Sequence, residues 1–386
     1  MPADPVRLGV VGVGALALRG LLPHLTQADV RERVSVLALC DPAIERAGAA
    51  AQRHGIPQVF ASLEELLSFD GLDAVSIATP IGLHYEHCRL ALEAGKHVHV
   101  NKTMTTTVAE ASDLIDLAHS RALRIVASPG EVLRPQVTRT RELLAEGAIG
   151  RLTWVICGAG FGAYHEQDEP ERSDGAQGPP INPAWYFRNP GGGPMFDMTS
   201  YSLHQLTSIL GPARRTTGLS GIRIHERRFL DATIQTEADD NTILLLEFDD
   251  KVFAIAYGTA AGDHSAQFGA GTYFGTAGVI EGVLLNGEPF EYPGKQLTDN
   301  APVTDWDAQM RVLPDVVGEH RRIPEAHVFQ DVMQLVDWVR DGTPSPVTAE
   351  HARHVIDIIE SGYQAAETGS TQELSTSFDW TGFAAV

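Results

Sequence analysis

The chain has few cysteines, no long apolar run and no signal-peptide pattern. Its three cysteines, Cys40, Cys88 and Cys157, are scattered over 386 residues and form no C-x-x-C pair. This usage predicts reduced thiols and argues against a disulfide framework or a cysteine-based zinc site. No apolar stretch approaches the ~20 residues that a membrane span needs. The first strand pattern starts without a preceding leader, so we expect a cytoplasmic protein that does not contact membranes.

Polyanions and metal ions are also not expected as partners. Acidic residues number 50 against 29 basic residues, the net charge is −21, and no basic stripe interrupts this excess. A nucleic-acid surface is therefore not predicted. Histidines do occur at short spacing, in the pairs His84/His87, His97/His99 and His351/His354. None of these pairs has the nearby carboxylates or third ligand that a metal site requires, so no metal is predicted.

A glycine motif near the N-terminus predicts a dinucleotide site. An apolar run over residues 7–11 leads directly into Gly12-x-Gly14-x-x-Ala17 and a helix pattern. Gly12 permits a tight turn, Gly14 lets the backbone approach a pyrophosphate, and Ala17 allows close helix–strand packing. N–H groups at the start of the helix would bind phosphate oxygens. The alternative is a glycine turn without a ligand. The residues assigned to the cofactor here are Gly12, Gly14, Ala15 and Leu16.

Asp41 ends the next apolar run, at the spacing expected for a ribose-binding carboxylate. It would accept hydrogen bonds from both ribose hydroxyls and repel a 2′-phosphate. The sequence therefore predicts NAD in preference to NADP. Arg46 leaves one alternative open, because a side chain folded over the ribose would tolerate the additional phosphate.

The pattern of elements predicts an α/β protein with two domains. Strand and helix patterns alternate up to residue 128, which is typical of a doubly wound parallel sheet, the Rossmann arrangement. Domain 1–128 would bind NAD, and domain 129–386 would be an α/β substrate and oligomerisation domain. The second domain contains strand-like runs without long helices between them, at 152–157, 242–248, 251–258 and 279–285. These predict an open, mainly antiparallel sheet. Late helix patterns cover 329–340 and 349–368, and 166–183 reads as a surface loop.

Two clusters carry candidate chemistry. Lys102 follows the predicted strand 97–100, and ligands of doubly wound sheets bind at the carboxyl ends of strands. Lys102 would hold a substrate oxygen or assist proton transfer, the alternative being a solvated surface lysine. A glycine run then opens a helix pattern that places Asp197, Tyr201 and His204 at i, i+4 and i+7, on one face. Together they would orient and deprotonate a hydroxyl, the alternative being a surface helix with a buried tyrosine.

Five sequence blocks resemble the glucose–fructose oxidoreductase / inositol dehydrogenase (Gfo/Idh/MocA) family. They are residues 9–17, 73–80 with His84, 91–98 leading to Lys102, 191–211 and 275–281. The resemblance covers nearly the whole chain. It implies a nicotinamide cofactor, a substrate that is a sugar, cyclitol or related polyol, and an open sheet that often forms an oligomer face. A homo-oligomer, dimer or tetramer, is therefore expected.

The resemblance also assigns individual residues. It implies that Thr79, Pro80, His84, Asn101 and Lys102 contact the cofactor. The family's glutamate–lysine–proline motif falls on Asn101-Lys102-Thr103, so only the lysine is retained. Its Asp-x-x-x-His falls on Asp197 and Tyr201, as in members that have tyrosine there. Trp185, Tyr186 and Arg188, just before the glycine run, would line the sugar pocket, the alternative being ordinary packing.

These residues predict an NAD-dependent oxidoreductase acting on a secondary hydroxyl, or the matching ketone, of a sugar, glycoside or cyclitol. Tyr201 would take the hydroxyl proton, and Lys102 would hold the oxygen and lower the Tyr201 pKa. Asp197 would orient substrate or tyrosine, and His204 would be a relay or a substrate contact. Two alternatives stay open: an enzyme that retains NAD and cleaves or eliminates a glycosidic bond through transient oxidation, and a non-catalytic sugar sensor.

Overall fold

The computed structural model describes residues 4–160, 162, 181–262, 271–298, 301 and 306–380. Most of the predicted surface loop 166–183 lies outside these ranges. Within them, no helix is both long enough and apolar enough to cross a membrane.

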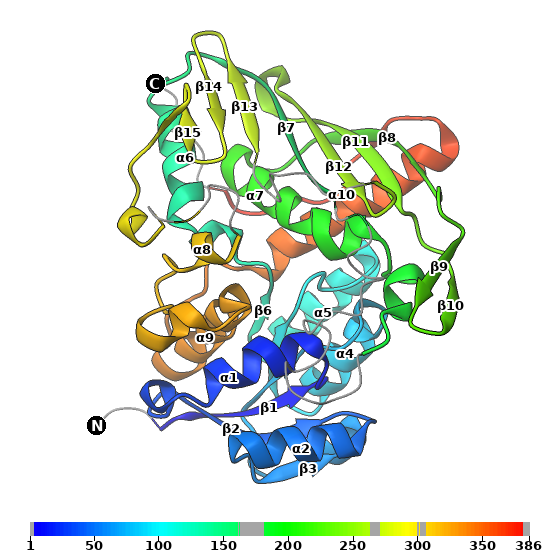
Figure 1. The fold of residues 1–386 in the computed structure, drawn as a ribbon, viewed down its shortest axis with the longest axis vertical. Coiled ribbons are helices and arrows are strands. Elements are labelled where there is room, and N and C mark those ends of the chain that lie inside the picture. Colours follow the sequence, from blue (N-terminus) through cyan, green and yellow to red (C-terminus); the bar gives the residue numbers. More distant parts are fainter. Residues whose placement is uncertain are drawn as a thin grey trace.

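Six parallel strands form the first sheet, in the order β3-β2-β1-β4-β5-β6, at the blue and cyan end of the molecule (Figure 1). The strands are β1 (Val6–Val11), β2 (Val34–Cys40), β3 (Gln58–Phe60), β4 (Ala74–Ile77), β5 (His97–Val100) and β6 (Ile125–Ala127). Leu8, Val75 and Val98 are fully buried, as expected for strands covered on both faces. The predicted Rossmann sheet is confirmed.

Short helices connect these strands. They are α1 (Leu22–Leu25), α2 (Ile44–His54), α3 (Leu63–Leu67), α4 (His84–Glu93) and α5 (Val108–Ser120), with a π-helical turn, Ala17–Leu21, before α1. The local sequence explains their ends. Thr107 and Glu110 form a capping box at the start of α5, and Gly55 takes the left-handed conformation that ends α2.

A nine-stranded sheet forms most of the second half, in the order β16-β15-β14-β13-β7-β12-β11-β8-β17. Its strands are β7 (Leu152–Gly160), β8 (Arg215–Gly221), β11 (Asn241–Glu247), β12 (Phe253–Thr259), β13 (Thr272–Gly275), β14 (Val279–Glu281), β15 (Leu284–Leu285), β16 (Glu288–Pro289) and β17 (Gln372–Glu373). Among the described strands of this second sheet only β7 and β12 pair in parallel, which confirms the mainly antiparallel prediction. The expected run 279–285 is a hairpin, because Gly282 adopts a positive φ between β14 and β15. A separate hairpin joins β9 (Glu226–Phe229) to β10 (Ala232–Gln235).

The helices of the second half pack on both sheets. They are α6 (Pro135–Ala145), α7 (Ser200–Leu210), α8 (Trp306–Met310), α9 (Ala326–Asp341) and α10 (Ala349–Thr368). Helix α9 returns to β5 and β6, and α10 lies between α5 and β8 (Figure 1). The core around β1 therefore includes Phe329 and Val332 from α9. The predicted domain boundary at residue 128 therefore separates α9 from the sheet against which it packs.

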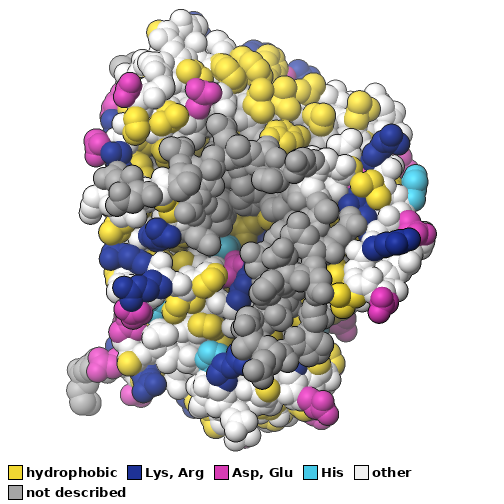
Figure 2. All heavy atoms as spheres, viewed as in Figure 1, with side chains coloured by type: hydrophobic (Ala, Val, Ile, Leu, Met, Phe, Trp, Pro, Cys, Tyr) yellow, Lys and Arg dark blue, Asp and Glu magenta, His cyan; other side chains and the backbone are white. Residues whose placement is uncertain are grey.

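The outer face of the second sheet is apolar and exposed. Leu219 on β8, Ile243 and Leu245 on β11, and Phe253 on β12 are each about half or more exposed, and Trp154 on β7 stacks on Phe274. Figure 2 shows hydrophobic side chains gathered over the part of the molecule where Figure 1 places these strands. An exposed patch of this kind is typical of a surface that binds a partner.

Candidate active site

A cavity of about 1010 Å³ opens at the carboxyl ends of the first sheet. The loops after β1, β2, β4 and β5 form one side of it, and residues at the starts of α7 and α9 form the other. Residues far apart in the sequence therefore meet in one space, at the position where ligands of doubly wound sheets bind.

The glycine loop forms an open cradle at one end of the cavity. Gly12 has a φ of +93°, and an added Cβ would lie 2.6 Å from the Ala78 carbonyl oxygen, so the position requires glycine. At Gly14 an added Cβ would meet no described protein atom within 4 Å, because this residue faces the cavity. Ala15 and Leu16 begin the following helical turn and also line the cavity. This geometry fits a dinucleotide pyrophosphate.

Asp41 lies beside this cradle and lines the cavity. Its carboxylate accepts hydrogen bonds from the backbone N–H of Val13 (2.8 Å) and of Ala43 (2.8 Å). Arg46 pairs with the same carboxylate at 2.8 Å and donates to the Val13 carbonyl oxygen. The Arg46 side chain therefore folds back onto the glycine loop, directly beside Asp41.

The loops after β4 and β5 supply the next part of the wall. Thr79, Pro80 and Asn101 line the cavity, but His84, implied as a cofactor contact, does not. The His84 ring nitrogens lie 2.7 Å from the Thr103 carbonyl oxygen and 2.8 Å from the Thr79 carbonyl oxygen, and burial lowers the His84 pKa to about 4. His84 thus joins the two loops from behind the wall, because its helix α4 begins beneath them.

Lys102 and Asp197 meet inside the cavity. The Lys102 ammonium donates to a carboxylate oxygen and to the backbone carbonyl of Asp197. Both side chains are largely buried, so the lysine is not the solvated surface residue of the alternative interpretation. The ammonium also lies 5.1 Å from the centre of the Tyr201 ring. Three of the four predicted catalytic residues are therefore neighbours.

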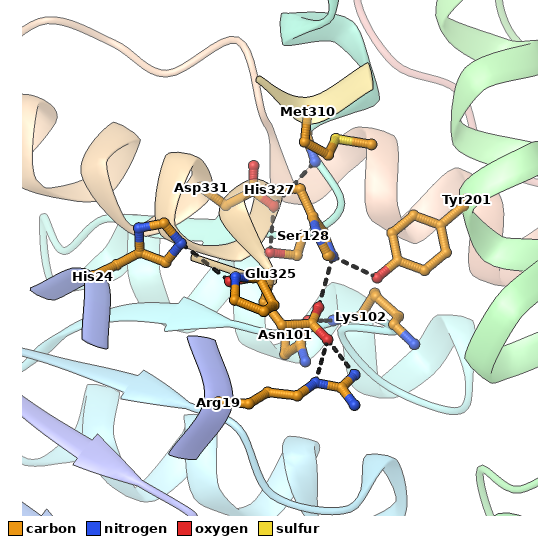
Figure 3. A network of polar contacts seen from close by, with 12 residues as sticks. Arg19, His24, Asn101, Lys102, Ser128, Tyr201, Met310, Glu325, His327 and Asp331 are labelled. Atoms are coloured by element: carbon orange, nitrogen blue, oxygen red, sulfur yellow. Dashed lines mark hydrogen bonds and ion pairs between the residues drawn. The ribbon is translucent and has the colours of Figure 1, made fainter. Parts of the chain in front are cut away.

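Tyr201 has a partner that the sequence did not identify. Its hydroxyl oxygen lies 2.8 Å from Nε2 of His327, at the start of α9 (Figure 3). The same Nε2 is 3.7 Å from a Glu325 carboxylate oxygen, and Glu325 pairs with Arg19. All four side chains line the cavity. A continuous series of polar contacts therefore runs from Tyr201 through His327 and Glu325 to Arg19.

The expectation that Lys102 lowers the Tyr201 pKa is wrong for this structure. Burial raises the pKa of Tyr201 well above 10, and the carboxylates of Glu325 and Asp197 raise it further. The lysine is paired with Asp197, so its charge is largely offset near the phenol. Tyr201 is therefore held as a neutral phenol.

His204 does not reach the cavity, contrary to the predicted common face. It is buried against His351, with ring centres 4.7 Å apart, and burial lowers its pKa to about 3. The π-helical turn Met195–Thr199 precedes α7 and contains Asp197. Because a π turn has more residues than an α turn, α-helical spacing counted from Asp197 no longer predicts the face of His204.

Only one of the three predicted pocket-wall residues lines the cavity. Trp185 does, whereas Tyr186 is fully buried against Phe187 and Phe229, and Arg188 is exposed. These residues belong to or follow the 3₁₀ turn Ala184–Phe187, in which successive side chains point in different directions. In the parts of the chain that the structure covers, no group of three or more His, Cys, Asp or Glu residues could hold a metal ion.

His327 was missed because the start of its helix was placed too late. The predicted helix pattern began at 329, whereas α9 begins at Ala326 and so includes His327. The usable signal was a set of polar residues, His327, Gln330 and Asp331, inside an otherwise apolar helix, all three of which are buried.

Two protein-family models match the chain. The model of the GFO/IDH/MocA oxidoreductase family with an NAD-binding Rossmann fold matches residues 6–128, and the GFO/IDH/MocA C-terminal domain matches residues 137–281.

Relatives and solved structures were also found. The dTDP-3,4-didehydro-2,6-dideoxy-alpha-D-glucose 3-reductase of Streptomyces antibioticus is 30% identical over 218 residues, 56% of this chain and 61% of that protein. The D-glucoside 3-dehydrogenase of Escherichia coli K12 is 26% identical over 215 residues, 55% of this chain and 56% of that protein. The crystal structure of GenD2 from gentamicin A biosynthesis, in complex with NAD, has a TM-score of 0.70 at 20% identity and covers 97% of this chain and 98% of GenD2.

Proposed function

Because the chain belongs to the Gfo/Idh/MocA family of oxidoreductases, we propose that it is an NAD-dependent dehydrogenase or reductase. Its substrate is a sugar, glycoside or cyclitol, and it interconverts a secondary hydroxyl and the matching ketone. The observation that carries this proposal is the meeting of Lys102, Asp197 and Tyr201 in one cavity, of which the glycine loop and Asp41 form another part.

The contacts support a role for each residue of the site. NAD, when bound, accepts the hydride that leaves the substrate carbon. Lys102, whose side chain lines the cavity, would hold the substrate oxygen with its ammonium. Asp197 fixes the lysine and so orients the oxygen. Tyr201 takes the hydroxyl proton. Trp185 offers an apolar ring to a sugar face from the cavity wall.

The cofactor is NAD in preference to NADP. The cradle of Gly12, Gly14, Ala15 and Leu16 would hold the pyrophosphate, and Thr79, Pro80 and Asn101 would contact the cofactor from the next loops. Asp41 would accept from the ribose hydroxyls. Arg46 offsets part of its charge, so the preference is finite.

The names of two relatives support carbon 3 of a hexose as the reacting position. One is a sugar 3-reductase and the other a glucoside 3-dehydrogenase. The chain is 26–30% identical to these two relatives over about half of its length. Because one name gives a nucleotide-linked sugar and the other a glucoside, the first test panel contains both classes of compound.

We further propose a cytoplasmic homo-oligomer with an NAD domain at 1–128 and a substrate and oligomerisation domain at 129–386. The exposed apolar face of β8, β11 and β12 supports self-association, because monomers rarely expose such patches.

The test is a spectrum of the purified protein at the reduced-nicotinamide band, recorded with NAD⁺ and each panel compound. Net NADH that increases in proportion to a ketone product supports the dehydrogenase. Product from a cleaved glycoside without net NADH would favour the NAD-retaining alternative. Ligand binding without either product would favour a sensor.

A further inference from the structure

We infer that Tyr201 and His327 work as a proton-transfer pair, in which His327 receives the tyrosine proton as Tyr201 takes the proton of the substrate hydroxyl. The inference rests on the proposed function and deepens it. It starts from the 2.8 Å contact between the Tyr201 oxygen and Nε2 of His327 inside the cavity (Figure 3).

His327 is firmly positioned for this contact. It lies in the first turn of α9, and Asp331, one turn later, accepts hydrogen bonds from the Ser128 hydroxyl (2.6 Å) and the Gly130 N–H (3.1 Å), which follow β6. On the other side, Glu325 pairs with Arg19 from the segment after β1. The helix that carries His327 is thus attached to the first sheet, while Tyr201 belongs to α7.

Burial and the neighbouring carboxylates disfavour a Tyr201 anion, so Tyr201 takes a proton only by passing on its own. Tyr201 is buried and its pKa is raised well above 10, so forming its phenolate is costly. Burial lowers the His327 pKa to about 4, which leaves an imidazole nitrogen free of a proton at neutral pH and able to accept one. The charged and titratable groups near His327 include Tyr201, Glu325 and three cations, Lys102, Arg134 and Arg19, which lower the His327 pKa further. Of these, Glu325 favours the cation that forms on His327.

Oxidation of the alcohol moves one hydride and two protons. The substrate C–H hydride leaves to the nicotinamide, and the substrate O–H bond breaks as its proton moves to the Tyr201 oxygen. The original Tyr201 proton moves to Nε2 of His327, which becomes an imidazolium 3.7 Å from the Glu325 carboxylate. Tyr201 is neutral before and after. In the reductive direction the imidazolium returns its proton to Tyr201, which protonates the carbonyl oxygen.

Turnover of two His327 variants tests this inference. His327→Gln retains a hydrogen-bond acceptor but accepts no proton, so we expect kcat to fall by about 10²-fold or more, with little change in NADH affinity. Its rate of alcohol oxidation should rise with pH, because solvent must then remove the proton, whereas the unmodified enzyme stays level near neutrality. His327→Ala should be partly rescued by added imidazole, since the deleted ring opens into the cavity.

Controls separate this role from a structural one. Tyr201→Phe combined with His327→Gln should be no slower than the slower single variant, because the pair acts as a unit. His119→Gln alters an exposed histidine on α5 and should leave kcat unchanged. Additive losses, or a His327→Gln enzyme with near-normal kcat and a normal pH profile, would overturn the inference.

A measurement on the protein without ligands tests the Tyr201–His327 pairing separately from the proposed function. In protein labelled with ¹⁵N-histidine, the His327 Nε2 resonance should carry the shift of a hydrogen-bond acceptor and change in Tyr201→Phe. No change would overturn the pairing itself. Absence of turnover on every panel compound, with the pairing present, would overturn the proposed function.

Discussion

Cofactor discrimination should depend on one carboxylate, Asp41. Its oxygens accept from Val13 N–H, Ala43 N–H and Arg46, so the charge is held at a fixed position beside the glycine loop. A 2′-phosphate bound there would approach this charge closely. We expect NADH to bind more tightly than NADPH, and Asp41→Asn to reduce the difference while keeping an oxygen acceptor for the backbone.

The magnitude follows from Coulomb's law. Two unit charges about 4 Å apart repel by about 1 kcal/mol in water and about 4 kcal/mol at the effective dielectric of a protein surface. Removing the Asp41 charge should therefore lower the ratio of NADPH to NADH dissociation constants by a factor between about 5 and about 10³. The lower part of this range is favoured, because Arg46 already offsets part of the charge.

Titration of each reduced cofactor by fluorescence or calorimetry measures the four dissociation constants. Asp41→Asn with Arg46→Ala is the matched control: without the guanidinium, NADPH should gain less than in the single variant. Equal affinities for the two cofactors in the unmodified protein, or an unchanged ratio in Asp41→Asn, would refute the reasoning.

Three further predictions concern the site, the stability and the assembly. Tyr201→Phe should lower kcat by about 10²–10⁴-fold with NAD affinity nearly unchanged, and Lys102→Ala should be at least as damaging, as steady-state kinetics and NADH titration would show; near-normal turnover in either would contradict its role. Asp240→Ala leaves the fully buried Arg227 without the carboxylate 2.9 Å away, and urea unfolding should report a loss of about 3–5 kcal/mol; a loss within error of zero would show that the pair does not contribute. Ile243→Lys, on the exposed apolar face, should shift the molar mass measured by light scattering toward the monomer, and an unmodified protein that is already monomeric would refute the interface.

Local patterns were sufficient for much of this protein. The glycine motif after an apolar run predicted the cradle after β1, and alternating strand and helix patterns predicted the six-stranded parallel sheet. Helix 349–368 was predicted with the bounds of α10, because Thr348 caps its start and Gly369 ends it in the left-handed conformation. Such signals are local, so they can be read without knowing what the segment packs against.

Local patterns were insufficient where a residue's surroundings come from another part of the chain. Helical spacing placed His204 with Tyr201, but α10 packs on α7 and buries His204 against His351, away from the cavity. The Tyr201 pKa was expected to fall because a lysine was near, yet burial and the carboxylates of Glu325 and Asp197 raise it, and the lysine charge is paired with Asp197. Neither burial nor pairing is visible in the spacing of residues.

The sequence by itself determined the two sheets, the dinucleotide cradle and the identity of Lys102, Asp197 and Tyr201 as candidates, since each depends on neighbours a few residues away. Only the tertiary structure decided which histidine belongs to the site. His327 is 126 residues from Tyr201, and the two meet because α9 returns to the first sheet while α7 approaches from the second. A contact of that range depends on how the core packs, and packing is a property of the whole chain.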